Sequence, residues 1–144
     1  MILMFGDHQP SDYICNPILR LMGQDSSIRE SSVDELRKGY VVPYILWSNY
    51  DLEKEEDKAI SANYLSGYLL DKIGLPLSGY QSWLSGLREE YPVITANFYA
   101  EGADSGLAFH KWEELPSESE VNDYNILQYN NLTDWKHRLT NFYD

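Results

Sequence analysis

The chain has 144 residues, 43% hydrophobic and 14% aromatic, which suffices for one folded core and excludes a disordered chain. Its 23 acidic and 11 basic residues give a formal net charge of −12, which excludes a general nucleic-acid binder. One cysteine, Cys15, excludes an intramolecular disulfide. No apolar run approaches the roughly 20 residues that cross a bilayer, so we expect this chain to be soluble.

The first predicted element is a buried strand, Met1–Gly6, that breaks abruptly into the polar sequence DHQP. A native N-terminus is usually polar and frayed, so this start suggests a truncated chain. Residues 12–22 carry apolar side chains at mixed spacing around Pro17, which predicts a short or broken helix.

Two elements are predicted in the next part of the chain. Ser32 and Glu35 have the spacing of a capping box, which indicates a helix over about 32–39. The nearly continuous apolar sequence YVVPYILWSN, residues 40–49, is typical of a strand in a sheet that helices cover on both faces. The acidic run that follows is interrupted by lysines and indicates a solvated loop.

The second half begins with two helices. Apolar residues at three-to-four spacing predict a helix over 57–74, and Gly74 stands where a C-terminal capping glycine belongs. A second helix, 78–91, begins at Ser78 and ends before Pro92.

The sequence PVITANFYA, residues 92–100, predicts another strand, and a Gly/Asp loop follows at 102–106. Ser117 and Glu120 have capping-box spacing at the start of a last helix, 117–131. Strands alternating with helices indicate an α/β fold. We find no repeat or linker, so residues 1–144 are predicted to form a single domain.

Asp7 and His8 are the candidate metal ligands. Ligands of α/β proteins bind beyond the carboxyl ends of strands, and these residues directly follow the first one. Both side chains reach one ion only if the backbone turns there, which Gly6 and Pro10 permit. A carboxylate with an imidazole suits manganese, zinc or iron. The alternative is an ordinary turn, with Asp7 accepting a backbone hydrogen bond and His8 exposed.

Other residues suggest weaker interpretations. Gln9 either faces a substrate or caps the turn. His110 and His137 lack the G-x-S-x-G sequence that would support a hydrolase triad. The four tryptophans, Trp47, Trp83, Trp112 and Trp135, suit core packing better than a sugar-binding platform.

The sequences FGDHQPS, VVPYILWSNYD, ISANYLSGYLLDKIGLPLSGYQSWLSGL and LQYNNLTDWK, in this order, resemble the C-terminal part of sulfatase-like proteins of the lipoteichoic acid synthase type. These are phosphoglycerol transferases of the alkaline phosphatase superfamily, anchored in bacterial membranes with the catalytic domain outside. The resemblance extends over nearly all of the chain. It implies the C-terminal portion of a three-layer α/β sulfatase-like fold.

The resemblance also implies residue roles. Asp7 and His8 match the family's Gly-Asp-His motif, whose Asp and His bind the catalytic divalent ion, usually manganese or zinc. Gln9 is then a candidate substrate-binding residue. The Thr or Ser nucleophile and the remaining metal ligands lie upstream in the family, so they are outside this chain. Lipoteichoic acid synthases differ from GDHQP after the histidine, which leaves the substrate open.

Two hypotheses follow. In the first, this chain is the C-terminal fragment of a membrane-anchored phosphoglycerol, or related phospho- or sulfo-group, transferase that acts on lipid- or polymer-linked substrates outside the cell. Its partner is the missing N-terminal part of the catalytic domain, and by itself the fragment is expected to be inactive and to bind no metal tightly. In the second, it is a self-standing noncatalytic binding module that keeps the sulfatase-like fold. Burial of the Met1–Gly6 strand on both faces would favour the self-standing module over the fragment of a transferase.

Overall fold

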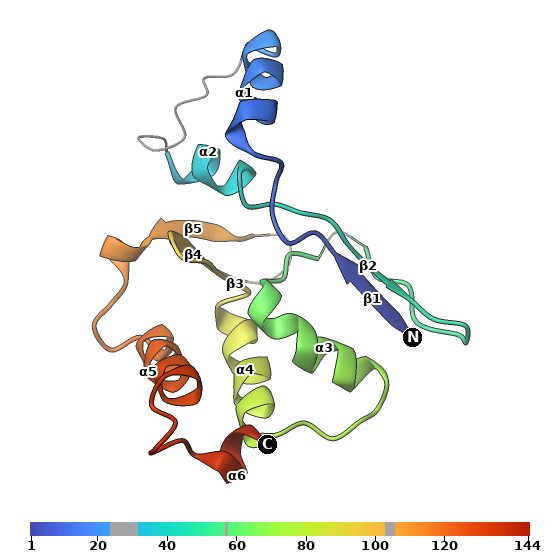
Figure 1. Ribbon diagram of the computed structural model, residues 1–144, viewed down its shortest axis with the longest axis vertical. Coiled ribbons are helices and arrows are strands. Elements are labelled where there is room, and N and C mark those ends of the chain that lie inside the picture. The colour runs from blue at the N-terminus through green and yellow to red at the C-terminus, as the bar shows by residue number, and fades with distance from the viewer. Residues whose placement is uncertain (24–31, 57, 103–105) are drawn as a thin grey trace. The chain divides into compact units, whose positions relative to one another are not determined.

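The computed structural model describes residues 1–23, 32–56, 58–102 and 106–144 (Figure 1). It is a mixed α/β protein with two small antiparallel sheets. Its contacts divide the chain into two compact units, Met1–Glu53 and Lys54–Asp144. Among the described residues, none of the helices has both the length and the apolar character needed to cross a membrane.

The described residues of the first unit form a two-stranded sheet and two helices. Strands β1 (Ile2–Phe5) and β2 (Tyr44–Trp47) pair antiparallel, with Ile2 opposite Trp47 and Phe5 opposite Tyr44. Helix α1 spans Asp12–Leu21, and helix α2 spans Val33–Lys38. The sequence prediction of the two strands is therefore confirmed, with boundaries a few residues narrower.

One face of this sheet is exposed and apolar. Side chains alternate between the faces of a strand, so the register places four residues on the same face. Each of them is 51–58% exposed: Ile2, Met4, Ile45 and Trp47. The predicted burial of the first strand, and helix cover on both faces of the second, are therefore wrong, because these four side chains are more than half exposed.

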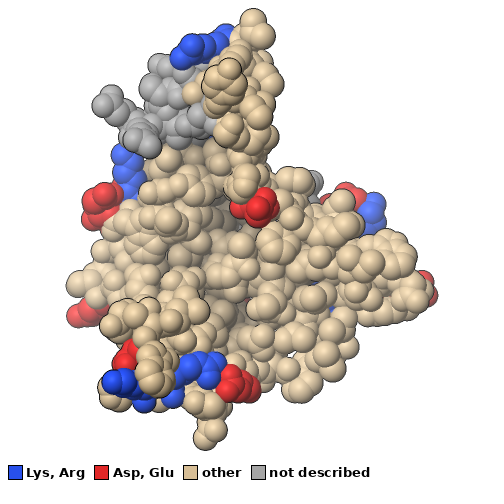
Figure 2. Space-filling model, in the orientation of Figure 1, with Lys and Arg blue, Asp and Glu red and all other residues tan. Residues whose placement is uncertain are grey.

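Helix α1 is short, as predicted, but it is not broken: it continues through Pro17. Its large apolar side chains Tyr13, Ile14, Ile18 and Leu21 are all exposed. In Figure 2, uncharged side chains cover most of the α1 surface that faces the viewer. Helix α2 starts after Ser32 as predicted, although the Ser32 side chain makes no capping hydrogen bond.

In the second unit, the residues that the structure describes form four α-helices and a three-stranded antiparallel sheet in the order β3-β4-β5. The strands are β3 (Val93–Ile94), β4 (Phe98–Glu101) and β5 (Ala108–Lys111). The helices are α3 (Leu65–Lys72), α4 (Gly79–Glu90), α5 (Glu120–Leu132) and α6 (Thr140–Tyr143), with 3₁₀ turns η2 (Ala62–Tyr64) and η3 (Trp112–Glu114).

Local sequence signals predict the two central helices well. Ser78 caps α4 by a reciprocal capping box with Gln81, and α4 ends before Pro92 as expected. Gly74 follows α3 with a φ of 70°, a conformation that glycine adopts easily. However, the predicted 57–74 helix begins only with η2 at Ala62, and residue 57 lies outside the described residues.

Two predictions in this unit are wrong in detail. The single strand at 92–100 is two strands, because the Thr95 hydroxyl accepts hydrogen bonds from the backbone N–H groups of Asn97 and Phe98 and forms a tight turn. Helix α5 begins at Glu120 and is capped by Ser119, not Ser117. Strand β5 was not predicted, and most of the predicted 102–106 loop, residues 103–105, lies outside the described residues.

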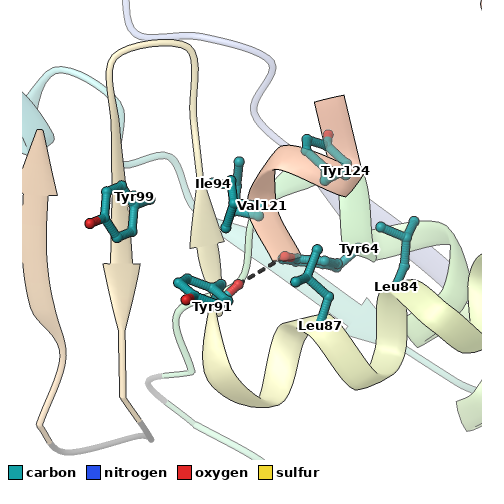
Figure 3. Packing of buried hydrophobic residues seen from close by; sticks show 8 residues of the cluster. All are labelled: Tyr64, Leu84, Leu87, Tyr91, Ile94, Tyr99, Val121 and Tyr124. Carbon is teal, nitrogen blue, oxygen red and sulfur yellow. Dashed lines mark hydrogen bonds between the residues drawn. The ribbon is translucent and has the colours of Figure 1, made fainter. Parts of the chain in front are cut away.

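The core of the second unit is rich in tyrosine (Figure 3). Leu87 and Val121 are almost completely buried, and the Tyr64 hydroxyl donates a 2.8 Å hydrogen bond to the Tyr91 carbonyl oxygen. The cluster consists of Tyr64, Leu84, Leu87, Tyr91, Ile94, Tyr99, Val121 and Tyr124. Its members come from η2, α4, α5, the sheet and Tyr91, which directly follows α4, so they hold the second unit together.

Candidate metal centre

The candidate metal ligands follow β1, where the two-stranded sheet ends. The Gly6 N–H donates a 3.0 Å hydrogen bond to the Pro43 carbonyl oxygen, which extends the β1–β2 pairing by one step. A Cβ atom on Gly6 would lie 3.0 Å from the Val42 Cβ. Gly6 therefore permits a close approach that a larger residue would disturb, and it places Asp7 beside the segment leading into β2.

Asp7 and His8 turn toward one another. The His8 backbone N–H donates a 3.0 Å hydrogen bond to Asp7 Oδ1, and His8 Nε2 lies 3.6 Å from Asp7 Oδ2. Their side chains are 84% and 77% exposed. The backbone turn needed to bring both side chains together is therefore present, and both remain accessible to an ion or a partner.

The other ring nitrogen of His8, Nδ1, contacts a backbone carbonyl oxygen. His8 Nδ1 lies 2.7 Å from the Gln9 carbonyl oxygen. A carbonyl oxygen only accepts hydrogen bonds, so this contact is a hydrogen bond in the tautomer that carries its proton on Nδ1, and in that neutral tautomer the lone pair lies on Nε2. Metal-binding histidines commonly donate their other N–H to a carbonyl or carboxylate in this way.

Gln9 connects this turn to the segment before β2. Its side-chain amide donates to the Val41 carbonyl oxygen, two residues before Pro43. The amide donor is thus used within the chain, and a substrate role for Gln9 stays a prediction. The partner is 32 residues away, so no local sequence signal could have identified Val41.

The residues present fit part of a metal site. Two ligands held at about 2.0–2.2 Å by one tetrahedral ion lie roughly 3.4 Å apart, close to the separation of Asp7 Oδ2 and His8 Nε2. Two ligands are fewer than the three or four of a stable site. Within the described ranges, no group of three or more His, Cys, Asp or Glu residues could hold a metal ion.

The other candidate residues have structural partners. His110 Nδ1 lies 3.2 Å from Glu114 Oε2, and His137 Nδ1 lies 2.8 Å from Asp134 Oδ1. The expected core role of the tryptophans is confirmed for Trp83 and Trp112, which pack against the core cluster of the second unit. It is wrong for Trp47 and Trp135, which are exposed.

The acidic run at 51–58 is not uniformly solvated. Glu55 accepts hydrogen bonds from Lys72 Nζ at 2.6 Å and from the Tyr68 hydroxyl at 3.0 Å, and both contacts are partly buried. Glu55 therefore ties the start of the second unit to α3. The prediction of a solvated loop is wrong at this residue, because Tyr68 and Lys72, which lie outside the run, hold its carboxylate in partly buried contacts.

Comparison with known proteins shows a similarity to a protein of known sequence. No protein-family model and no solved structure matches the chain. A protein of Rhizobium meliloti (strain 1021) named "Putative cyclic beta-1,2-glucan modification protein" is 24% identical over 147 aligned residues, which cover 99% of this chain and 22% of the relative. The chain is thus similar over nearly its whole length to a protein of which it spans about a fifth.

Proposed function

We propose that this chain is the C-terminal portion of a metal-dependent enzyme that transfers phosphoglycerol, or a related phospho or sulfo group, to cell-surface polymers or lipids. The observation that carries the proposal is the Asp7–His8 pair, with Oδ2 and Nε2 3.6 Å apart at the end of β1. Similarity to a protein named for glucan modification supports a glucan as the polymer acceptor. The small share of that relative that the chain covers supports a larger parent.

In this proposal each residue has a distinct role. A divalent ion held by Asp7 and His8 would supply positive charge that activates an attacking hydroxyl and neutralises phosphoryl oxygens. Asp7 contributes the negative charge that holds the ion, and His8 binds as a neutral ligand through Nε2. Neither residue is the nucleophile. A Thr or Ser of the preceding region would attack phosphorus through its hydroxyl oxygen and displace the alcohol of the donor, and a hydroxyl of the acceptor would then displace the Thr or Ser oxygen from phosphorus.

The exposed apolar surface of the first unit supports a partner in the same polypeptide. A sheet of two strands is marginally stable by itself, and contiguous exposed apolar side chains mark surfaces that pack against something else. The open face of β1 and β2 carries four such side chains, Ile2, Met4, Ile45 and Trp47. We propose that the preceding region of a three-layer sulfatase-like domain covers them, in a membrane-anchored parent with its catalytic domain outside the cell.

The alternative is a self-standing noncatalytic binding module. A module of this kind is expected to bury β1 on both faces, because no further part of the protein would cover it. The exposure of Ile2 and Met4 favours the larger enzyme instead.

The test of activity uses the full-length gene product that contains this chain, with phosphatidylglycerol as donor and a cyclic β-1,2-glucan as acceptor. We expect Asp7→Ala and His8→Ala each to lower transfer at least about a hundredfold, because a lost metal ligand removes several kcal/mol of charge stabilisation. The matched controls are Asp134→Ala and His137→Ala, which remove an exposed Asp–His pair of the second unit and should leave transfer unchanged. Equal transfer by all four variants would contradict the proposal.

A second test uses the chain by itself. With only Asp7 and His8 as ligands, we expect no stoichiometric manganese or zinc after dialysis against a mild chelator, and no turnover of a chromogenic phosphodiester. Elemental analysis and absorbance measure the two quantities. Retention of one metal ion per chain would mean that other residues of this chain complete the site.

A further inference from the structure

We propose that Gln9 is a positioning residue for His8: it holds the imidazole in the tautomer that leaves Nε2 free beside Asp7 Oδ2. The role of Nε2 as a metal ligand rests on the proposed function, whereas the orientation of the ring rests on the contacts of Gln9 alone. Gln9 contributes twice, through its backbone carbonyl and through its side chain.

The first contribution is direct. The Gln9 carbonyl oxygen lies 2.7 Å from His8 Nδ1 and accepts a hydrogen bond from it in the proposed tautomer. Which ring nitrogen of a neutral histidine carries the proton is set by the hydrogen bond that the other nitrogen makes. The Asp7 carboxylate, with Oδ2 3.6 Å from Nε2, favours a proton on Nε2, so the Gln9 carbonyl must keep its direction for the Nδ1-protonated tautomer to predominate.

The second contribution fixes the direction of that carbonyl. The Gln9 side chain donates to the Val41 carbonyl oxygen, and the Gly6 N–H donates to the Pro43 carbonyl oxygen. These two bonds bracket Asp7 and His8 and tie the turn to the segment before β2. Removing the Gln9 donor frees one end of the turn, including the peptide group that His8 contacts.

Packing does not replace these bonds. The Asp7 and His8 side chains are largely exposed, so few neighbours restrict their rotamers. A free neutral imidazole in water favours the proton on Nε2, the tautomer in which this nitrogen has no lone pair for a metal ion. A functional pair of ligands needs supporting hydrogen bonds to stay in a productive geometry, and Gln9 supplies them here.

The experiment is ¹⁵N-resolved NMR of the histidine rings in the metal-free chain at about pH 8.5, where an ordinary histidine is neutral. We expect His8 to be protonated mainly on Nδ1. Gln9→Leu removes the amide donor without adding a charge or a new ligand, and we expect it to move the proton toward Nε2. Gln128→Leu is the matched control, since the Gln128 amide donates to the Tyr124 hydroxyl in the second unit. It should leave His8 unchanged.

A zinc titration of the same samples separates this inference from the proposed function. We expect the His8 Nε2 signal to respond to zinc, with an affinity about tenfold or more weaker in Gln9→Leu. If His8 is mainly protonated on Nε2 in the unaltered chain, or if Gln9→Leu leaves its tautomer unchanged, the positioning role is wrong. If the tautomer changes but Nε2 does not respond to zinc, the positioning role stands and the proposed metal site is contradicted.

Discussion

The Ser61 hydroxyl hydrogen-bonds both backbone polar groups of Ile94. It accepts from the Ile94 N–H at 2.7 Å and donates to the Ile94 carbonyl oxygen at 3.0 Å. Ser61 and Ile94 are both buried, and Ile94 belongs to β3, the strand at the edge of its sheet. One side chain thus provides hydrogen-bond partners for the two backbone polar groups of Ile94, on the edge of the sheet that faces away from β4.

Replacement of Ser61 should therefore lower the free energy of unfolding. Ser61→Ala leaves the N–H and carbonyl groups of Ile94 without this partner, and a buried unsatisfied group costs about 1–3 kcal/mol. We expect the free energy of unfolding to fall by about 2–4 kcal/mol in urea titrations. Ser66→Ala, at an exposed position of α3, is the control and should change it by less than about 0.5 kcal/mol. Similar values for both variants would contradict this interpretation.

Two glycines of the same helix should respond oppositely to alanine. A Cβ atom at Gly79 would lie 2.7 Å from Phe142 Cδ2 and 3.2 Å from the Phe142 carbonyl oxygen, so α6 must shift. We expect Gly79→Ala to lower the free energy of unfolding by about 1–3 kcal/mol. A Cβ atom at Gly86 meets no atom within 4 Å, and Gly86→Ala should raise stability by about 0.5–1 kcal/mol. Urea unfolding of both variants measures the difference, and stabilisation of both would show that α6 adjusts freely.

The tyrosine-rich core should weaken in alkali. Burial, with a smaller effect of Tyr124 and Tyr143, raises the pKa of Tyr80 to about 12, and burial also raises the pKa of Tyr64. Above about pH 10 the unfolded chain releases these protons while the folded chain keeps them, so stability is complete below pH 10 and declines as pH rises toward 12. Tyr80→Phe should make the decline shallower, by at most about 1.4 kcal/mol per pH unit. Unfolding in urea between pH 8 and 12 tests this, and parallel curves would contradict it.

Acid should destabilise the start of the second unit, where Glu55 contacts Lys72 and Tyr68. The hydrogen bond from Lys72, followed by that from Tyr68, lowers the pKa of Glu55. The stabilisation by this carboxylate is therefore present above its ordinary pKa, near 4, and is lost as pH falls below that range. We expect Glu55→Gln to cost about 1–2 kcal/mol at pH 7 and to flatten the loss of stability below pH 5.

The neighbouring Glu56 is the control for Glu55. It forms an exposed ion pair with Lys54, of the kind that contributes little to stability. Glu56→Gln should leave both the free energy of unfolding at pH 7 and the acid profile unchanged. Equal effects of the two substitutions would mean that the Lys72 contact is unimportant.

The sequence by itself determined the elements whose signals are local. Ser78 and Gln81 bond within one helical turn, and Gly74 needs only its own backbone freedom, so α4 and the end of α3 are predicted correctly. The break after β1 is equally local, because Gly6 and the polar residues behind it are adjacent in the chain. The presence of Asp7 and His8 at a strand end therefore follows from the sequence alone.

Only the tertiary structure decided the contacts between distant segments. The Gln9 amide reaches Val41, Ser61 reaches Ile94, and Glu55 reaches Lys72, and these pairs are separated by 32, 33 and 17 residues. Hydrophobic periodicity also could not tell that the apolar face of β1 stays exposed, because the pattern marks a surface that avoids water without identifying what covers it. Hydrogen-bond partners and burial depend on which segments meet, and that is a property of the folded chain as a whole.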